Sequence, residues 1–302
     1  MYGVSSEQVT HIWGRMQETM PTQPSDLRAL HSSLFLLATN VSWDQLADCQ
    51  PLWTSSGVNE RTLRRDFNRI GDLFLAHPLM NPMLRFSHTI PWMEQVTVIV
   101  DATTVQCRAK REVRRGRDDD ENEPVIVDRT YSGKTRTRCF KIEIHTTMCG
   151  VPIFARRCVA GSMHDARLFK EGSKLYQHYT WETFLVDLGY EGCGHVLTPF
   201  KRRRGEQLSA DDALFNKKHG LVRSRIERLF SFMDLFRCFW HTEHNEKWLD
   251  RAVAIVLNVF YSLFASQPQY GDAVPLDLAS LEKQSAGAAA GAVCRYQPID
   301  VG

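Results

Sequence analysis

The sequence lacks an excess of charge of either sign. Its 302 residues include 37 lysines and arginines against 35 aspartates and glutamates, for a net charge of +2. This balance excludes a histone-like protein, which binds nucleic acid through a large overall positive charge. A balanced total can still conceal local clusters of opposite sign, and this chain contains several of them.

The eight cysteines include no C-x2-C pair, which is the spacing typical of structural zinc sites. They are also too sparse for the disulfide scaffold of a small secreted domain. We therefore expect free thiols in a reducing compartment.

Long hydrophobic runs are also missing. The longest covers residues 252–265 and includes Asn258. A membrane-spanning helix needs about 20 apolar residues, so this run is expected to form a buried helix instead. Residues 1–15 contain no apolar signal core. We expect a soluble, intracellular protein without membrane attachment.

Residues 1–90 are predicted to form an all-helical module. Leu63, Phe67 and Ile70 recur at helical spacing after Asn59, a residue that can cap a helix. A short helix, a turn and this arginine-rich helix resemble a helix-turn-helix, in which Arg64 and Arg65 would contact DNA. A plain helical bundle with solvated arginines explains the same pattern, and both interpretations stay open.

Residues 91–265 are predicted to form an α/β domain. The β-branched run Val96–Val100 is typical of a strand buried on both faces. Further strands are expected at 141–148, 151–155 and 184–186, and helices at 161–179, 209–239 and 247–265.

Two segments carry no sign of regular structure. Residues 108–123 form a basic block followed by an acidic block, which is typical of a solvated loop or a disordered segment. Residues 266–302 are rich in alanine, glycine and serine and are expected to form a poorly ordered tail.

Three acidic side chains are placed where they could meet. Asp101 is expected to follow the first buried strand and Asp187 the fourth, and carboxylates just past such strands project from one edge of a sheet. Glu227 lies on the long helix just past the border of its apolar stripe. Arg223, one turn earlier, could pair with Glu227.

Converging carboxylates suit two Mg²⁺ (or Mn²⁺) ions, because these hard cations prefer oxygen ligands. Two such ions can clamp the attacking and leaving oxygens of a phosphodiester bond. Each acid alone is more often a surface carboxylate or a salt-bridge partner, so the hypothesis depends on their combined positions. It makes Asp101, Asp187 and Glu227 the predicted catalytic and metal-binding residues.

Seven motifs in order, from about residue 96 to residue 264, carry a resemblance to a family. Six are VDATTV, YSGKTRTRCFKIEIHTTM, AGSMHDARLF, FLVDLGYEG, LTPFK and ALFNKKHGLVRSRIERLF, and the seventh is the closing apolar helix. The chain resembles the DDE-type transposases of the PIF/Harbinger group and the domesticated nucleases derived from them.

The resemblance implies an RNase H-like fold, with a mixed five-stranded sheet flanked by helices. Asp101, Asp187 and Glu227 match the family's catalytic acids. Asp165, beside His164, matches a position near the site and is an accessory residue or an alternative metal ligand. A helix cap explains Asp165 as well, because a carboxylate is favourable at a helix N-terminus.

The resemblance also implies an activity. The protein would cut DNA at transposon ends and join the 3′-hydroxyl to target DNA, as a homodimer in the nucleus with the help of a Myb-like partner protein. Ala102, Leu188 and the short separation of Asp187 from Glu227 depart from the group's usual pattern. A domesticated, catalytically silent DNA-binding or scaffold protein is therefore the alternative, and a nuclease without strand transfer is a third option.

An enzyme that acts on DNA must neutralise phosphate groups. The predicted DNA-contacting residues are Arg64, Arg65, Lys134, Arg136, Arg138, Lys201, Arg202, Arg203, Arg204, Lys217, Lys218, Arg223 and Arg225. The run 201–204 also resembles a nuclear import signal, although a phosphate contact or a solvated loop explains it equally. Trp181, Tyr190 and Trp240 are expected to fill the core rather than to stack on bases.

Overall fold

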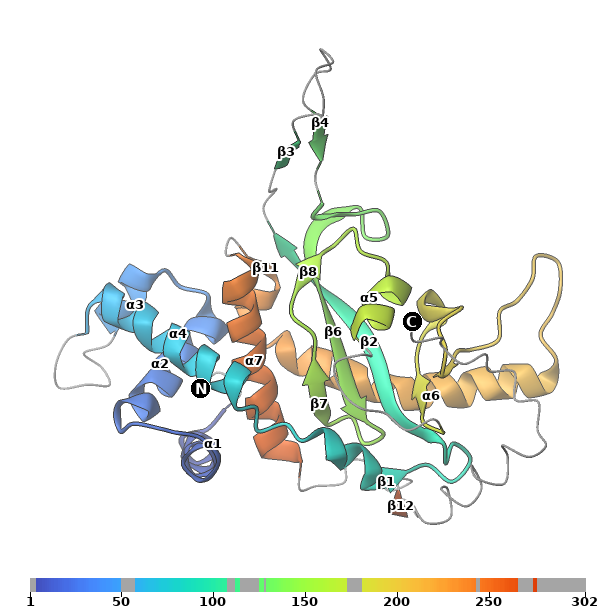
Figure 1. Ribbon diagram of the computed structural model, residues 1–302, viewed down its shortest axis with the longest axis horizontal. Coiled ribbons are helices and arrows are strands. Elements are labelled where there is room, and N and C mark those ends of the chain that lie inside the picture. The colour runs from blue at the N-terminus through green and yellow to red at the C-terminus, as the bar shows by residue number, and fades with distance from the viewer. Residues whose placement is uncertain are drawn as a thin grey trace.

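A mixed β-sheet with helices on both faces forms the centre of the molecule (Figure 1). The structure is a computed structural model that describes residues 4–49, 58–107, 112–114, 125–127, 129–172, 181–242, 245–265 and 274–275. The α-helices are α1 (Ser6–Thr19), α2 (Ser25–Thr39), α3 (Trp43–Cys49), α4 (Glu60–Ala76), α5 (Asp165–Gly172), α6 (Ala210–Met233) and α7 (Glu246–Phe264). Short 3-10 helices are η2 (Pro82–Phe86), η4 (Leu188–Tyr190) and η5 (Arg237–Phe239).

The sheet follows the path β10-β9-β2-β6-β5, with β7 and β8 also paired to β6 and β11 to β2. Its strands are β2 (Val96–Cys107), β5 (Tyr131–Ser132), β6 (Thr137–Thr147), β7 (Pro152–Ala155), β8 (Val159–Ala160), β9 (Thr183–Leu185), β10 (Val196–Leu197) and β11 (His241–Thr242). β9 lies parallel to both β2 and β10, whereas β6 is antiparallel to β2 and β7. A separate short pair joins β1 (His88–Thr89) to β12 (Val274–Pro275).

Strand β2 is longer than the sequence predicts. The β-branched residues continue through Thr103, Thr104 and Val105, and the pairing with β6 extends to Gln106, opposite Cys139. The prediction that Asp101 follows the end of this strand is therefore wrong, since Asp101 lies in its middle.

The charged segment contains some regular structure. Glu112–Arg114 (β3) pairs antiparallel with Val125–Val127 (β4), and Figure 1 shows this hairpin projecting away from the sheet. The expectation of a loop or disorder throughout residues 108–123 is thus wrong for the β3 portion, where valines on both strands favour pairing. Residues 108–111 and 115–124 lie outside the described residues, as does all of the tail except β12.

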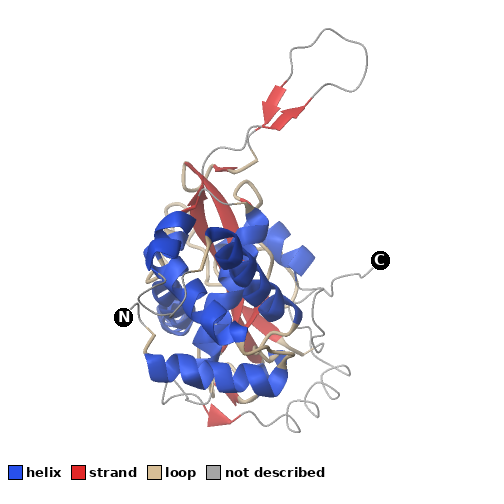
Figure 2. Cartoon of the chain, turned by 90° about the vertical axis from the view of Figure 1, so that its left-hand side faces the viewer, coloured by secondary structure: helices blue, strands red, loops and turns tan. Residues whose placement is uncertain are grey.

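The N-terminal helices pack against α7. Asn59 caps α4 as predicted, because its side chain accepts a hydrogen bond from the Thr62 amide at 2.9 Å. Phe67 of α4 stacks on Trp248 of α7 with ring centroids 5.1 Å apart. Figure 2 shows these helices in front of the sheet. Residues 50–57 lie outside the described residues, so the helix-turn-helix interpretation stays a prediction.

The two long C-terminal helices, α6 and α7, form largely as the sequence predicts. α6 runs unbroken through Gly220, and α7 forms over the apolar segment as predicted, with Ile255, Val256 and Leu257 fully buried. None of the described helices is long and apolar enough to cross a membrane.

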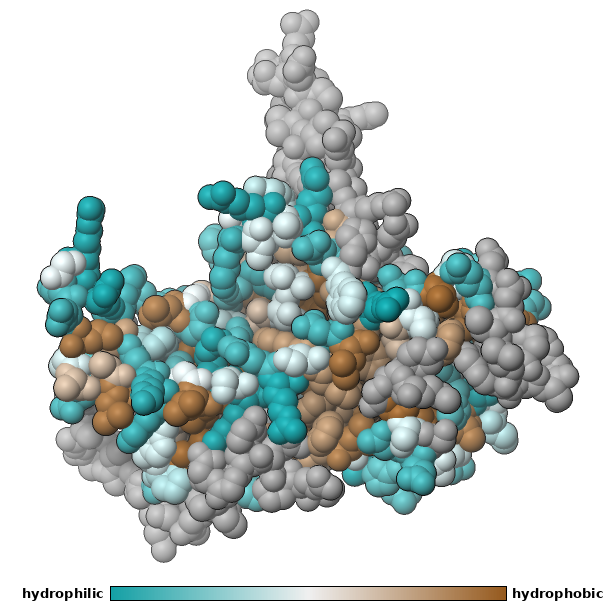
Figure 3. All heavy atoms as spheres, turned by 180° about the vertical axis from the view of Figure 1, so that it is seen from behind, coloured by the Kyte–Doolittle hydropathy of each residue, from teal (hydrophilic) through white to brown (hydrophobic). Residues whose placement is uncertain are grey.

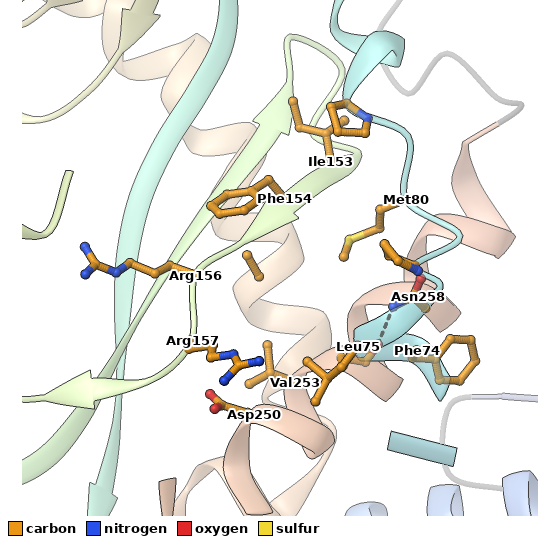
Figure 4. Close-up of a pocket in the computed structure, with 14 residues that line it drawn as sticks. Phe74, Leu75, Met80, Ile153, Phe154, Arg156, Arg157, Asp250, Val253 and Asn258 are labelled. Carbon is orange, nitrogen blue, oxygen red and sulfur yellow. Dashed lines mark hydrogen bonds between the residues drawn. The ribbon is translucent and has the colours of Figure 1, made fainter. Parts of the chain in front are cut away.

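A cavity of about 210 Å³ lies where the N-terminal helices meet the sheet. Figure 4 shows Phe74 and Leu75 of α4, Ile153 and Phe154 of β7, and Val253 of α7 around it. Its lining contains none of the acidic residues predicted to be catalytic. The cavity therefore lies in the packing between the N-terminal helices and the sheet, and not at the predicted catalytic acids.

Candidate active site

Asp101 enters the candidate site from the middle of β2. Residues of a strand alternate between the two faces, and Asp101 shares the face of Ile99, whose cluster includes Ile226 of α6. The Asp101 side chain is 16% exposed and accepts a hydrogen bond from the Ala102 amide at 2.8 Å. It therefore presents one carboxylate oxygen towards α6.

Arg223 joins Asp101 to Glu227. Its guanidinium donates to the Oδ2 atom of Asp101 and, at 3.2 Å, to the Oε1 atom of Glu227 one turn further along α6. The buried side of α6 carries Val222, Ile226, Leu229 and Met233. Glu227 lies beside this stripe with its side chain 56% exposed, as the helical spacing predicts.

Asp187 follows strand β9, as predicted, and caps the short helix η4. Its Oδ1 atom accepts a hydrogen bond from the Gly189 amide. A Cβ atom built on Gly189 would lie 2.9 Å from Oδ1 of Asp187 and 3.1 Å from Oδ2 of Asp165. The two carboxylates therefore border the same small space, and that space requires glycine between them.

Asp165 opens helix α5 and is held by two lysines. Lys141, a buried residue of β6, places its Nζ atom 2.8 Å from Oδ1 of Asp165, and the exposed Lys134 lies 3.5 Å from Oδ2. Both carboxylate oxygens thus have a cationic partner in the protein. A metal ion at Asp165 would therefore compete with these two lysines. His164, immediately before it, is exposed.

All of these acids fall within a segment that matches one protein family. A family model described as DDE superfamily endonuclease matches residues 100–260, which is more than half of the chain. The chain belongs to the DDE superfamily of endonucleases. No match was found among curated proteins or among solved structures. The matched segment of this DDE endonuclease contains Asp101, Asp165, Asp187 and Glu227.

Burial and neighbouring charges shape the electrostatics of the candidate site. Burial raises the pKa of the Asp101 carboxyl from 3.8 to about 6, the charge of Asp187 adds to the rise, and Arg223 opposes it. Burial also raises the pKa of the Tyr190 hydroxyl well above its usual value, with further contributions from Glu143, Asp101 and other nearby acids. Negative charge therefore accumulates here, and the Tyr190 hydroxyl stays neutral.

The acidic side chains of this site are of the type that binds divalent cations. Endonucleases of this superfamily generally use divalent metals, and carboxylate oxygens are preferred ligands of Mg²⁺. In the described part of the chain, no three His, Cys, Asp or Glu side chains are close enough together to hold a metal ion. The Arg223 guanidinium lies between Asp101 and Glu227 and supplies the positive charge there. An ion shared by these two acids would compete with Arg223 for their oxygens.

Two predicted placements are wrong. Arg225 was assigned to DNA contact, yet it is 5% exposed and its guanidinium donates to the Met148 carbonyl at 2.8 Å, so it supports the β6–β7 turn. Trp240 was expected in the core, yet it is 59% exposed. Trp181 and Tyr190 are buried, as expected.

Most of the other basic residues predicted to contact DNA are exposed, and some of them also pair with acidic residues of the protein. Exposed residues of the predicted DNA-contacting set are Arg64, Arg65, Lys134, Arg136, Arg138, Lys201, Arg202, Arg203, Arg204, Lys217 and Lys218. Of these, Arg64 pairs with Glu60 and lies over the ring of Trp43 at 5.0 Å. Arg223 is partly buried in the acidic site.

The sequence interpretation missed three polar residues of β6. Lys141, Glu143 and His145 alternate with Ile142 and Ile144 and are all buried. The Glu143 Oε1 atom lies 3.1 Å from Nε2 of His145. The alternation of polar and apolar residues in KIEIH was the available signal, because it places three polar side chains on one face of a strand.

Replacing Arg223 by glutamine is expected to strengthen Mn²⁺ binding about tenfold, a change of about 1.4 kcal/mol. The variant removes the cation that competes for Asp101 and Glu227 and leaves their mutual repulsion uncompensated. Isothermal titration calorimetry without DNA measures the affinity. Arg228→Gln, an exposed neutralisation on the same helix, is the matched control. An R223Q variant that binds Mn²⁺ more weakly than the wild type would show that Arg223 positions the acids rather than competing for them.

Proposed function

We propose that this chain is a metal-dependent DNA endonuclease and strand transferase of the PIF/Harbinger type. It would cut phosphodiester bonds at transposon ends and join the resulting 3′-hydroxyl to target DNA. The supporting observation is the pairing of Asp101 and Glu227 through one guanidinium, although they lie far apart in the sequence. The family match over residues 100–260 supports the same class of activity.

The fold proposed for the catalytic domain is RNase H-like. The strand order β7-β6-β2-β9-β10 supports this fold, because the sheet is mixed. Strand β6 is antiparallel to β7 and β2, whereas β9 is parallel to β2 and β10. Asp101 lies on β2, Asp187 after β9 and Glu227 on α6, and these are the three residues that match the family's catalytic acids in sequence.

In this proposal Asp101, Asp187 and Glu227 hold two Mg²⁺ or Mn²⁺ ions. When bound, the ions would activate the attacking oxygen and stabilise the departing one. Asp165 lies beside the turn at Gly189, and Lys141 holds Asp165 from within the sheet. Lys134 lies beside Asp165 and is 71% exposed, which suits contact with a DNA phosphate.

The proposed partners follow from the same resemblance. DNA would lie over the exposed basic residues before β6, after β10 and along α6. Two transposon ends require two active sites, so we propose a homodimer. A Myb-like partner protein and a nuclear location complete the proposal.

One observation favours the alternative of a catalytically silent DNA-binding or scaffold protein. Arg223 forms ion pairs with both Asp101 and Glu227, and this guanidinium competes with a metal ion for the two acids. The alternative predicts DNA binding without cleavage and no metal bound between the acids.

A plasmid assay tests the proposal. The full chain is incubated with supercoiled plasmid that carries the matching terminal repeats and with a labelled oligonucleotide that ends in such a repeat with a free 3′-hydroxyl, in Mg²⁺, Mn²⁺ or EDTA. We expect metal-dependent nicking and covalent transfer of the label to the plasmid. Nicking without transfer indicates a simple nuclease. DNA binding with neither product, and no Mn²⁺ binding by calorimetry, would contradict the proposal and support the silent protein.

A further inference from the structure

Two large aromatic side chains are exposed beside the N-terminal half of α6. Trp92, in the turn before β2, is 42% exposed, and Phe200, after β10, is 45% exposed. Exposed aromatic rings that gather on one surface often mark a binding site. Neither residue has a role in the acidic site described above.

Phe200 is fixed to α6 by a specific set of contacts. Its amide donates to Asn216 Oδ1 at 2.8 Å, and Asn216 Nδ2 donates back to the Phe200 carbonyl at 3.0 Å. Its ring packs edge-on against Phe215, with centroids 5.1 Å apart. Contacts with α6 therefore fix the position of the exposed Phe200 ring.

Phe215, which packs against the Phe200 ring, also lines an open pocket of about 510 Å³ that Trp92 borders. Phe215 and Trp92 both line the pocket, together with the polar residues Glu94, Gln95 and Thr183. The Lys218 ammonium lies 5.4 Å from the centroid of the Trp92 ring. The pocket thus combines aromatic walls, hydrogen-bonding groups and a nearby cation.

The surroundings of this pocket are basic. Lys201, Arg202, Arg203 and Arg204 follow Phe200 directly, Lys217 neighbours Lys218, and all of them are exposed. Figure 3 shows apolar and hydrophilic residues interspersed over this end of the molecule, at the left of the view. A polyanion that also carries flat apolar groups complements such a surface.

The pocket is within reach of the acidic site. Phe215 and Glu227 lie on the same helix, 12 residues apart by number. At 1.5 Å per residue their backbones are about 18 Å apart, a distance that a few nucleotides of an extended strand can cover.

We propose that this aromatic pocket, lined by Trp92, Glu94, Gln95 and Phe215 and flanked by Phe200 and Lys218, binds an unpaired base of the DNA strand next to the cleavage point. The inference rests on the proposed function and names its substrate more closely, as DNA with unpaired bases. Bases within a duplex stack on each other and cannot reach these rings, whereas single-stranded DNA is bound by aromatic stacking beside basic residues. Glu94 and Gln95 would meet the hydrogen-bonding edge of the base.

Fluorescence anisotropy of the full chain, in EDTA to prevent cleavage, tests the proposal. One labelled probe is a blunt duplex and the other is the same duplex with a short single-stranded extension. We expect the wild type to prefer the extended probe. Trp92→Ala and Phe200→Ala should each weaken its binding about tenfold and leave the blunt duplex unaffected. Trp92→Phe, which keeps an aromatic ring, should retain the preference.

Trp240 offers the matched control, because it is also exposed and has a cation, Arg237, 5.9 Å from its ring. Trp240→Ala should change binding to neither probe. Equal losses on both probes from Trp92→Ala, or no preference of the wild type for the extended probe, would overturn the proposal. If the wild type shows no preference for the extended probe, an acidic peptide becomes the better candidate ligand, because the same basic residues complement its charge. Because EDTA is present, a protein that fails to cut DNA can still pass this test, so the two proposals fail separately.

Discussion

Asp101→Asn is expected to reduce metal-dependent nicking at least about 10³-fold. The substitution keeps the shape of the side chain but removes one of three carboxylates proposed to hold the ions. Such ions contribute several kcal/mol of charge stabilisation, and each 1.36 kcal/mol corresponds to a factor of ten in rate. Asp187→Asn and Glu227→Gln should have effects of the same order. Plasmid nicking rates in Mg²⁺ and Mn²⁺ provide the measurement.

Stability measurements separate this loss from unfolding. Because burial raises the pKa of Asp101 to about 6, the folded protein binds a proton at this site more readily than the unfolded chain does. Ionised Asp101 therefore costs stability above that pKa, and the cost disappears as the pH falls towards 3.8. Asp101→Asn should unfold at pH 7.5 at a temperature no lower than the wild type.

Asp234→Asn is the matched control for the activity measurement, since this exposed acid ends the same helix that carries Glu227. It should leave nicking unchanged. Unchanged nicking in the Asp101 and Glu227 variants would instead show that the site assignment is wrong.

Arg85→Ala is expected to lower the free energy of unfolding by about 3–5 kcal/mol. Arg85 and Glu182 are 2% and 0% exposed, and the Arg85 Nε atom lies 2.7 Å from Glu182 Oε1. Thr97 of β2 donates a second hydrogen bond to the same oxygen at 2.8 Å. Removing the arginine leaves a buried carboxylate without its cation, and that is the costly outcome. Urea denaturation followed by circular dichroism measures it.

A double variant distinguishes the pair from its surroundings. Replacing both partners, as Arg85→Met with Glu182→Leu, removes the buried charges together and should recover most of the loss. Arg65→Ala, at a side chain that is 73% exposed, should change stability by less than about 0.5 kcal/mol. A loss below about 1 kcal/mol for Arg85→Ala would contradict this account.

The Arg85–Glu182 pair also lies next to an element that carries a proposed catalytic residue. It attaches η2 to the residue immediately before β9, and β9 ends two residues before Asp187. A destabilised pair should therefore also disturb the position of Asp187.

Several elements of the fold were predictable because they depend on neighbours in the sequence. The cap at Asn59, the apolar stripe of α6 and the buried helix α7 all follow from patterns within a few residues. The position of Asp187 after a short buried strand follows in the same way. Helix capping and periodicity are local effects, so the sequence displays them directly.

Other features were not predictable because distant contacts decide them. β2 continues past Asp101 since β6 pairs with it as far as Gln106, and Arg225 is buried since the Met148 carbonyl needs a donor. Trp240 is exposed although its residue type favours the core. Local patterns carry no information about which remote segment supplies the pairing partner.

The sequence by itself determined the superfamily and the helical position of Glu227, and it supplied the prediction of which acidic residues form the site. Only the tertiary structure decided that Arg223 stands between Asp101 and Glu227, that Asp165 is paired with Lys141, and that an aromatic pocket opens beside α6. The physical reason is that residue types and short spacings are written along the chain. Ion pairs, burial and pockets arise only when segments far apart in the chain pack against each other.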